Sequence, residues 1–230
     1  MTDPDLTRIG ETLAKASDAR SLRAVLASFK GIDWERFPQA RLQLSRMLIR
    51  KGLARDGLDL LPEPEDPLQA EVEQLRAYGL ANTGAPLTAA RHLQELLAQG
   101  HEDSETLGLL GRTEKDLARR AEQRTEAMSH WRNALQYYRR AFDLTGDSYP
   151  GINAAALSLR VGAIAQAQSL AQKVLSVCDA QLRGASNGDD WTLSTKAEAL
   201  LILGQTAAAQ QFYRQAAERL GSDWSALGST

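Results

Sequence analysis

The stretch GQTAAAQQFYRQA, residues 204–216, carries the pattern that most clearly indicates how this chain folds. Gly204 opens it, Ala209 follows five residues later, and Tyr213 and Ala216 continue at steps of four and three. Such steps place side chains on one face of a helix, where short side chains let a second helix approach closely and the aromatic residue is expected to fill the gap to the next pair. The stretch therefore predicts one arm of a tightly packed pair of helices.

The same spacing recurs upstream. The further copies are Gly84 with Ala89 and Leu93, Gly162 with Ala167, and Ala134 with Tyr138 and Ala141. The interval from Ala134 to Ala167 is close to the period of about 34 residues of tetratricopeptide repeats, and the other intervals are longer. A plain helical bundle is the alternative interpretation, but it gives no reason for Gly to precede Ala by five residues three times.

The rest of the chain predicts helices as well. No hairpin dipeptide lies between alternating apolar residues, and Gly or Pro punctuates runs of strong helix formers. We predict an all-α, right-handed tetratricopeptide-like superhelix, an α-solenoid of about six antiparallel helix pairs. Its expected parts are divergent N-terminal pairs over 1–61, a Pro-rich acidic linker over 62–68, repeats over 69–221, and a cap or frayed tail over 222–230.

Composition excludes several classes of protein. Among 230 residues there is one cysteine, Cys178, and the three histidines form no metal-ligand pattern, so we expect no disulfide, metal or cofactor. Acidic residues precede any apolar run and no window approaches about 18 apolar residues, which predicts a cytoplasmic protein that does not enter a membrane. The net charge of -2 gives no reason to expect nucleic acid as a partner.

Three motifs in the second half are recognisable together: LLGRTEKD at 109–116, YYRRAF at 137–142 and YPGINAA at 149–155. With them, residues 103–220 resemble the TRAF-binding, tetratricopeptide-containing regulatory region of the apoptosis signal-regulating kinases. Trp191, Thr195, Ala197 and Glu198 are similar to the W-x3-T-x-A-E segment of bacterial relatives of that region.

The resemblance implies a scaffold for regulated protein association. For the bacterial relatives it implies sensing of a nucleotide-derived small molecule in stress or conflict signalling. The chain contains no kinase Gly-rich loop, HRD or DFG motif, so kinase activity is not implied. We expect the repeat module alone.

Ligands of such a solenoid usually lie in the concave groove formed by the first helix of each pair. Arg112, Lys115 and Asp116 can share one helix face there, either facing a ligand or forming an internal Arg112 to Asp116 ion pair with Lys115 solvated. Pro150 and Gly151 open the next first helix, with Ser148 as the expected cap, so an anion could dock at its free N–H groups.

Trp191 suits stacking on a planar ring, although an aromatic residue at a helix start is also typical of a packing staple. We expect an elongated, solvent-facing helix between Gly111 and Ala134. Basic residues outnumber acidic ones between 112 and 140, whereas 56–73 is acidic. The predicted binding set is Arg112, Lys115, Asp116, Tyr149, Gly151, Asn153, Trp191, Lys196 and Glu198.

Catalysis has little support in the sequence. Cys178 lies in an apolar run with no histidine at a readable partner position, and no pair of carboxylates is evident. We therefore expect a non-enzymatic protein-interaction scaffold in stress or defence signalling that binds a protein partner or effector. The alternative is a sensor of a nucleotide-derived anion that regulates an effector; a hydrolase or transferase is a third, weakly supported interpretation.

Overall fold

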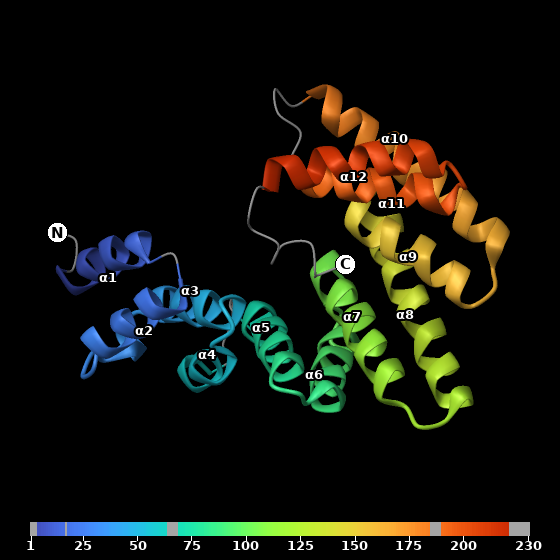
Figure 1. The fold of residues 1–230 in the computed structure, drawn as a ribbon. Coiled ribbons are helices and arrows are strands. Elements are labelled where there is room, and N and C mark those ends of the chain that lie inside the picture. Colours follow the sequence, from blue (N-terminus) through green and yellow to red (C-terminus); the bar gives the residue numbers. More distant parts are fainter. Residues whose placement is uncertain (1–3, 17, 64–68, 185–189, 221–230) are drawn as a thin grey trace. The chain divides into compact units, whose positions relative to one another are not determined.

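The computed structural model describes residues 4–16, 18–63, 69–184 and 190–220, and within them it contains helices and no strands (Figure 1). The chain divides into two compact units, Met1–His101 and Glu102–Thr230. Unit 1 contains α1 (Pro4–Lys15), α2 (Ala19–Ser28), the short 3-10 helix η1 (Trp34–Arg36), α3 (Pro38–Arg50), α4 (Ala54–Leu60), α5 (Gln69–Asn82) and α6 (Pro86–Ala98). Unit 2 contains α7 (Ser104–Arg120), α8 (Arg124–Thr145), α9 (Ser148–Arg160), α10 (Ile164–Gly184), α11 (Asp190–Ile202) and α12 (Thr206–Leu220).

In unit 1, α3 is shared by two apolar clusters. Leu44 and Leu48 pack in the cluster of α1 and α2, whereas Leu42 and Ile49 pack with residues of α4 and α5. Helices that bury residues on two faces in this way link one pair to the next, which is how repeat proteins share a core between neighbours.

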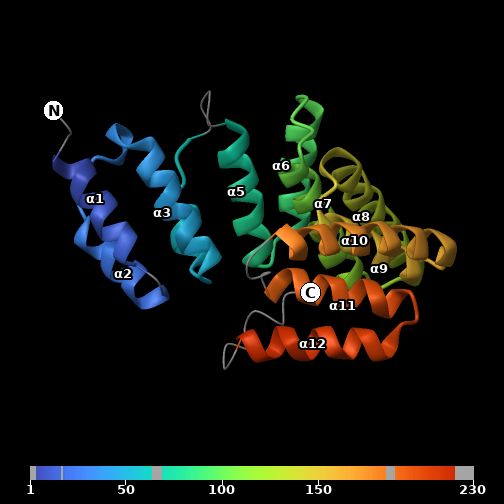
Figure 2. The same cartoon turned by 90° about the horizontal axis from the view of Figure 1, so that it is seen from above.

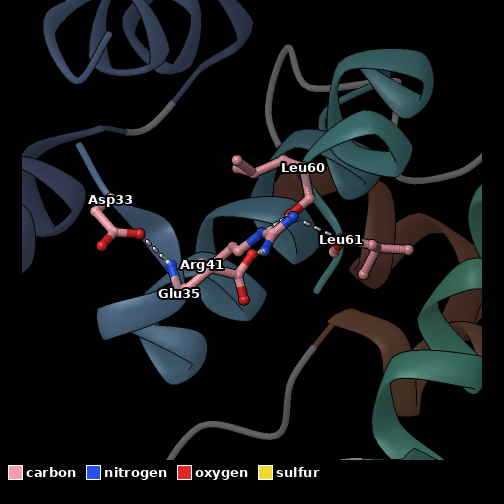
Figure 3. Close-up of polar contacts among 5 residues, drawn as sticks. All are labelled: Asp33, Glu35, Arg41, Leu60 and Leu61. Atoms are coloured by element: carbon pink, nitrogen blue, oxygen red, sulfur yellow. Dashed lines mark hydrogen bonds and ion pairs between the residues drawn. The ribbon is translucent and has the colours of Figure 1, made fainter. Parts of the chain in front are cut away.

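Arg41 joins α3 to the end of α4 (Figure 3). Its Nε donates to the carbonyl of Leu60 at 2.7 Å, and its Nη2 donates to the carbonyl of Leu61 at 3.2 Å. Its Nη1 donates to Glu35 Oε1 at 2.6 Å, while Asp33 caps η1 by accepting from the Glu35 N–H. A guanidinium thus satisfies carbonyls that the end of α4 leaves without helical partners.

In unit 2, one continuous core runs from α7 to α11 around the fully buried Tyr138. Successive pairs pack on one another, and Figure 2 shows α10, α11 and α12 lying side by side. Two glycines allow close approach inside this core. A Cβ on Gly111 would lie 2.7 Å from the Tyr138 ring, and one on Gly151 would lie 2.7 Å from Val174 Cγ2.

The prediction of an all-α fold with about six helix pairs is confirmed. The anchor residues Ala89, Ala134, Ala167 and Ala209 are all buried. Gly162 and Gly204 turn the chain between helices with φ of 83° and 77°, which glycine adopts most readily. The right-handed superhelix and the proposed domain boundaries stay predictions; residues 64–68 of the linker and the tail 222–230 lie outside the described residues.

Three local expectations differ from the structure. The expected elongated helix between Gly111 and Ala134 is interrupted, because α7 ends at Arg120 and α8 begins at Arg124. Ser148 is not the cap of α9 but its buried first residue, after Asp147 at the N-cap. Tyr213 does not fill a gap between pairs: it is 38% exposed, because no described helix follows α12 to cover it.

Candidate ligand pocket in unit 2

A pocket of about 280 Å³ lies among the first helices of the three pairs in unit 2. Lys115 and Arg119 come from α7, Trp191, Thr195 and Glu198 from α11, and Trp131 from α8. The largest share comes from α9, with Tyr149, Ile152, Asn153, Ala156, Leu157 and Arg160. Its volume suits a small molecule, being near the lower end of the roughly 300–1,000 Å³ of typical ligand sites.

Helical periodicity brings these side chains together. On α7 the two pocket residues are four apart, and on α11 they follow at steps of four and three. Side chains at such steps share one helix face, so three helices each present one face with polar and apolar side chains to the same space. The pocket therefore forms where these faces of α7, α9 and α11, the first helices of the three pairs, meet.

Lys115 is held by its neighbours on α9. Its Nζ donates to Asn153 Oδ1 at 2.8 Å, while Asn153 Nδ2 donates to the Tyr149 carbonyl at 3.0 Å. Burial lowers the pKa of the Lys115 ammonium, and the nearby positive charge of Arg119 lowers this pKa further. One of its three N–H donors is thus used on a neutral amide, and a bound anion would stabilise the charged form.

Aromatic rings line the pocket beside these cations. Tyr149 and Trp191 are stacked with ring centroids 6.4 Å apart and an interplanar angle of 29°. Tyr149 also meets the edge of Tyr138, whose centroid is 6.2 Å away. On the other side, the Arg160 guanidinium lies 4.0 Å from the centroid of the Trp131 ring, a cation–π contact that orients it.

Glu198 adds a carboxylate to this set. It is half-buried on α11, and burial raises the pKa of its carboxyl while the charge of Lys115 opposes that rise. The two groups therefore act on each other across the pocket, one from α7 and one from α11. The pocket combines three cations, one carboxylate, one amide and accessible aromatic rings.

Five residues of the predicted binding set line this pocket: Lys115, Tyr149, Asn153, Trp191 and Glu198. Trp191, for which a packing staple was the alternative, is half-buried and contributes a ring face. The predicted alternative of a solvated Lys115 does not hold, because Lys115 is half-buried and bonded to Asn153.

The other four predicted residues lie outside the pocket lining. Asp116 accepts a hydrogen bond from Arg119 Nη1 at 2.9 Å. Lys196 pairs with Asp179 at 2.6 Å and lies over the Phe212 ring. Gly151 is buried against Val174 and Phe142, where its missing side chain serves helix packing. Arg112 influences the pKa of Lys115 but does not line the pocket.

Seven residues that line the pocket are outside the predicted set, and three of them, Arg119, Trp131 and Arg160, bring a charge or an aromatic ring. Arg119 follows Lys115 by four positions and Arg160 follows Asn153 by seven, so extending each helix face by the same periodicity finds both. Trp131 lies on a second helix, and no sequence signal connects it to the groove. Its place depends on how α8 packs against α9.

The described residues hold no group of three or more His, Cys, Asp or Glu side chains that could bind a metal ion. Cys178 is fully buried in the core. Two of the histidines contact glutamates within helix pairs: His92 Nδ1 lies 2.8 Å from Glu73 Oε2, and His130 Nδ1 lies 2.6 Å from the buried Glu114 Oε2. In the described ranges, no helix has the length and apolar character needed to cross a membrane.

By its fold the chain is a tetratricopeptide-repeat protein, a class of protein-binding and typically non-enzymatic scaffolds. It belongs to the Tetratricopeptide Repeats-Sensor family, whose model matches residues 38–158. None of the characterised proteins compared with it matches its sequence.

Solved structures share the fold at low sequence identity. TTC0263, a thermophilic TPR protein of Thermus thermophilus, is 20% identical with a TM-score of 0.65, covering 82% of this chain and 94% of that one. A Podosopora anserina protein with nearly identical TPR-like repeats is 14% identical with a TM-score of 0.56, covering 82% and 97%. The human IFIT1 dimer with PPP-AAAA is 14% identical with a TM-score of 0.53, covering 89% of this chain and 59% of that one.

Proposed function

We propose that this chain is a non-enzymatic sensor module whose pocket in unit 2 binds a small, nucleotide-derived anion. The observation that supports this most directly is the gathering of three cations and two accessible aromatic rings around one pocket. Cations bind phosphate groups, and aromatic faces bind planar bases by stacking.

The cations differ in how they are held, which suits them to one anion. Lys115 is held by its hydrogen bond to Asn153, and Arg160 is held by its cation–π contact with the Trp131 ring. Arg119 lies at the exposed rim with Asp116. Because none of these contacts uses all the N–H donors of its cation, phosphate oxygens can be bound without breaking the framework.

The aromatic pair supplies the second part of the site. Tyr149 is 40% exposed and Trp191 is half-buried, so both rings have faces that a planar group can reach. Stacking of a nucleic acid base on an aromatic side chain contributes about 1–3 kcal/mol. The pair therefore favours ligands with a heteroaromatic ring over inorganic anions.

The family and a structural neighbour support this proposal, but neither assigns a binding role to a particular residue of this chain. The family is described as a sensor family, and the human IFIT1 structure carries PPP-AAAA. The resemblance of residues 103–220 to the kinase regulatory region supports a role in stress or defence signalling. A ligand that touches three helix pairs would hold them in one arrangement, which a protein effector could recognise. We place this action in the cytoplasm, as the sequence predicts.

Calorimetric titration with a panel of nucleotides tests the proposal. We expect Lys115→Ala and Trp191→Ala each to weaken binding by about tenfold or more, because one removes a charged hydrogen bond and the other a stacking face. Lys173→Ala, which removes an exposed lysine on α10 outside the pocket, is the matched control and should leave the affinity unchanged.

Two results would contradict the sensor function. One is that the wild-type chain binds no member of the panel; the other is that Lys115→Ala, still folded by circular dichroism, binds as tightly as Lys173→Ala.

Exposed apolar side chains support docking of a protein partner as a second function. Leu159 near the end of α9 and Ile164 at the start of α10 flank one turn, and Ile164 is 60% exposed. Side chains of this kind are typical of interfaces when they gather on one surface. Ile164→Asp should abolish partner capture without changing nucleotide affinity, whereas unchanged capture would exclude this turn as the docking surface.

A further inference from the structure

Glu198 is unusual among the acidic side chains around the pocket. Asp116 pairs with Arg119, and Asp179 pairs with Lys196. In the part of the chain that the structure describes, no side chain forms a hydrogen bond or ion pair with the Glu198 carboxylate, although it is half-buried. Because it lines the pocket and has no protein donor among the described residues, the Glu198 carboxylate can accept hydrogen bonds from a ligand.

The position of Glu198 also bears on what the ligand must look like. It lines the same pocket as Lys115, Arg119 and Arg160, and it interacts with the charge of Lys115. A ligand that carried only negative charge would be repelled by this carboxylate, which would oppose the attraction of the three cations. A ligand that presents O–H donors beside its anionic group would instead satisfy it.

The spacing along α11 shows that the hydroxyl donors for Glu198 and the ring that stacks on Trp191 must be different parts of the ligand. Trp191 and Glu198 are seven residues apart on one helix, a rise of about 10 Å. The ring and the donor group are therefore different parts of one ligand. Two adjacent hydroxyls match the two oxygens of a carboxylate, and a carboxylate is the group that binds ribose hydroxyls in dinucleotide-binding folds.

We infer that Glu198 is a specificity residue that selects ligands with a vicinal diol, so that the pocket takes a ribose-containing nucleotide rather than its deoxy form or a simple polyanion. This inference rests on the proposed sensor function of the same pocket. It assigns to Glu198 a contact with the sugar, separate from the phosphate contacts of the cations and from the stacking on Tyr149 and Trp191.

The test compares ribonucleoside diphosphates of the common bases with their 2′,3′-dideoxy counterparts and with inorganic pyrophosphate, by calorimetry on the full chain. We expect the wild type to bind the best ribonucleotide at least about tenfold more tightly than its dideoxy form. Glu198→Gln should reduce this preference to within about threefold. The same variant should bind pyrophosphate more tightly than wild type, because the repulsion is gone. Glu218→Gln, an exposed site on α12, is the matched control and should behave as wild type.

The outcomes separate the two proposals. If the wild type binds nucleotides through Lys115 but does not distinguish ribose from dideoxyribose, or if Glu198→Gln keeps the distinction, the diol inference is wrong and the sensor function stands. If no ribonucleotide binds at all, both are overturned. The gain in pyrophosphate affinity is a result that loss of folding in Glu198→Gln cannot produce.

Discussion

Arg41 in unit 1 and the cations of the pocket in unit 2 show two different uses of positive charge. The Arg41 guanidinium donates to two backbone carbonyls and to Glu35, so its donors are directed into the protein (Figure 3). Lys115 directs one hydrogen bond to Asn153, and Arg160 lies on an aromatic ring. The contacts of Arg41 stabilise the packing of helices in unit 1. Those of Lys115 and Arg160 hold the two cations in place and leave N–H donors free to bind a ligand in the pocket.

Partner chemistry, rather than residue type, therefore distinguishes a structural cation from a binding one. Carbonyls and carboxylates at hydrogen-bond distance consume the donors of Arg41. A neutral amide or a ring face orients a cation without neutralising it. Substitutions in the two regions should therefore separate stability from binding.

The largest effect is expected at Tyr138, the buried ring beside Tyr149 and Lys115. Tyr138→Ala should lower the free energy of unfolding of unit 2 by about 3–5 kcal/mol, because a fully buried aromatic side chain leaves a cavity. Tyr213→Ala is the matched control at the same repeat position, where exposure should keep the loss below about 1 kcal/mol. Urea unfolding measures both, and equal losses would contradict the burial argument.

Arg41→Ala should have the next largest effect, on stability alone. Removing hydrogen bonds from a charged group and leaving buried carbonyls without a partner should lower the free energy of unfolding of unit 1 by about 2 kcal/mol. Nucleotide affinity should stay at the wild-type value, which is the reverse of the result expected for Lys115→Ala. Arg55→Ala, an exposed site on α4, serves as the control for thermal melting.

A smaller effect is expected from pH. As the pH falls through the raised pKa of Glu198, its carboxyl gains a proton and the repulsion of anions is lost. As the pH rises toward the lowered pKa of Lys115, its ammonium loses a proton and attraction is lost. Both changes make the binding of an anion without hydroxyl donors tighter at lower pH.

2′,3′-Dideoxyadenosine 5′-sulfate is the suitable probe for this titration, because its own charge stays constant over the range and it lacks the diol that Glu198 is inferred to bind. Glu198→Gln should remove the change on the acidic side and keep the change on the basic side. Binding that weakens as the pH falls would contradict the assignment of both groups.

The smallest effect is expected from Tyr138→Phe. The Tyr138 hydroxyl is buried and makes no hydrogen bond of normal geometry among the described residues, although burial and an interaction with the Tyr149 side chain raise its pKa. Deleting it should leave the free energy of unfolding unchanged or raise it by up to about 1 kcal/mol. A loss of stability in urea unfolding would show that the hydroxyl has a partner in solution.

Much of the fold could be predicted from local pattern. The small residues at repeat positions and the glycines between helices identified the pairs, because helical periodicity and turn geometry depend on near neighbours. The break at residues 121–123 gave no such signal, since Ala121, Glu122 and Gln123 suit a helix and no Gly or Pro marks the turn. The packing of α7 against α8 decides it.

The amino-acid sequence alone was enough to predict the helix pairs, the tetratricopeptide-repeat class and the helix faces that carry Lys115, Asn153 and Trp191. Only the tertiary structure decided that Gly151 lies under Phe142 and Val174, that Trp131 reaches the pocket from a second helix, and that Glu198 faces Lys115. The difference arises because a sequence pattern reports on residues that are near neighbours along the chain, whereas a pocket depends on contacts between distant segments. Periodicity fixes which side chains share a face of one helix, whereas the packing between pairs fixes which faces meet.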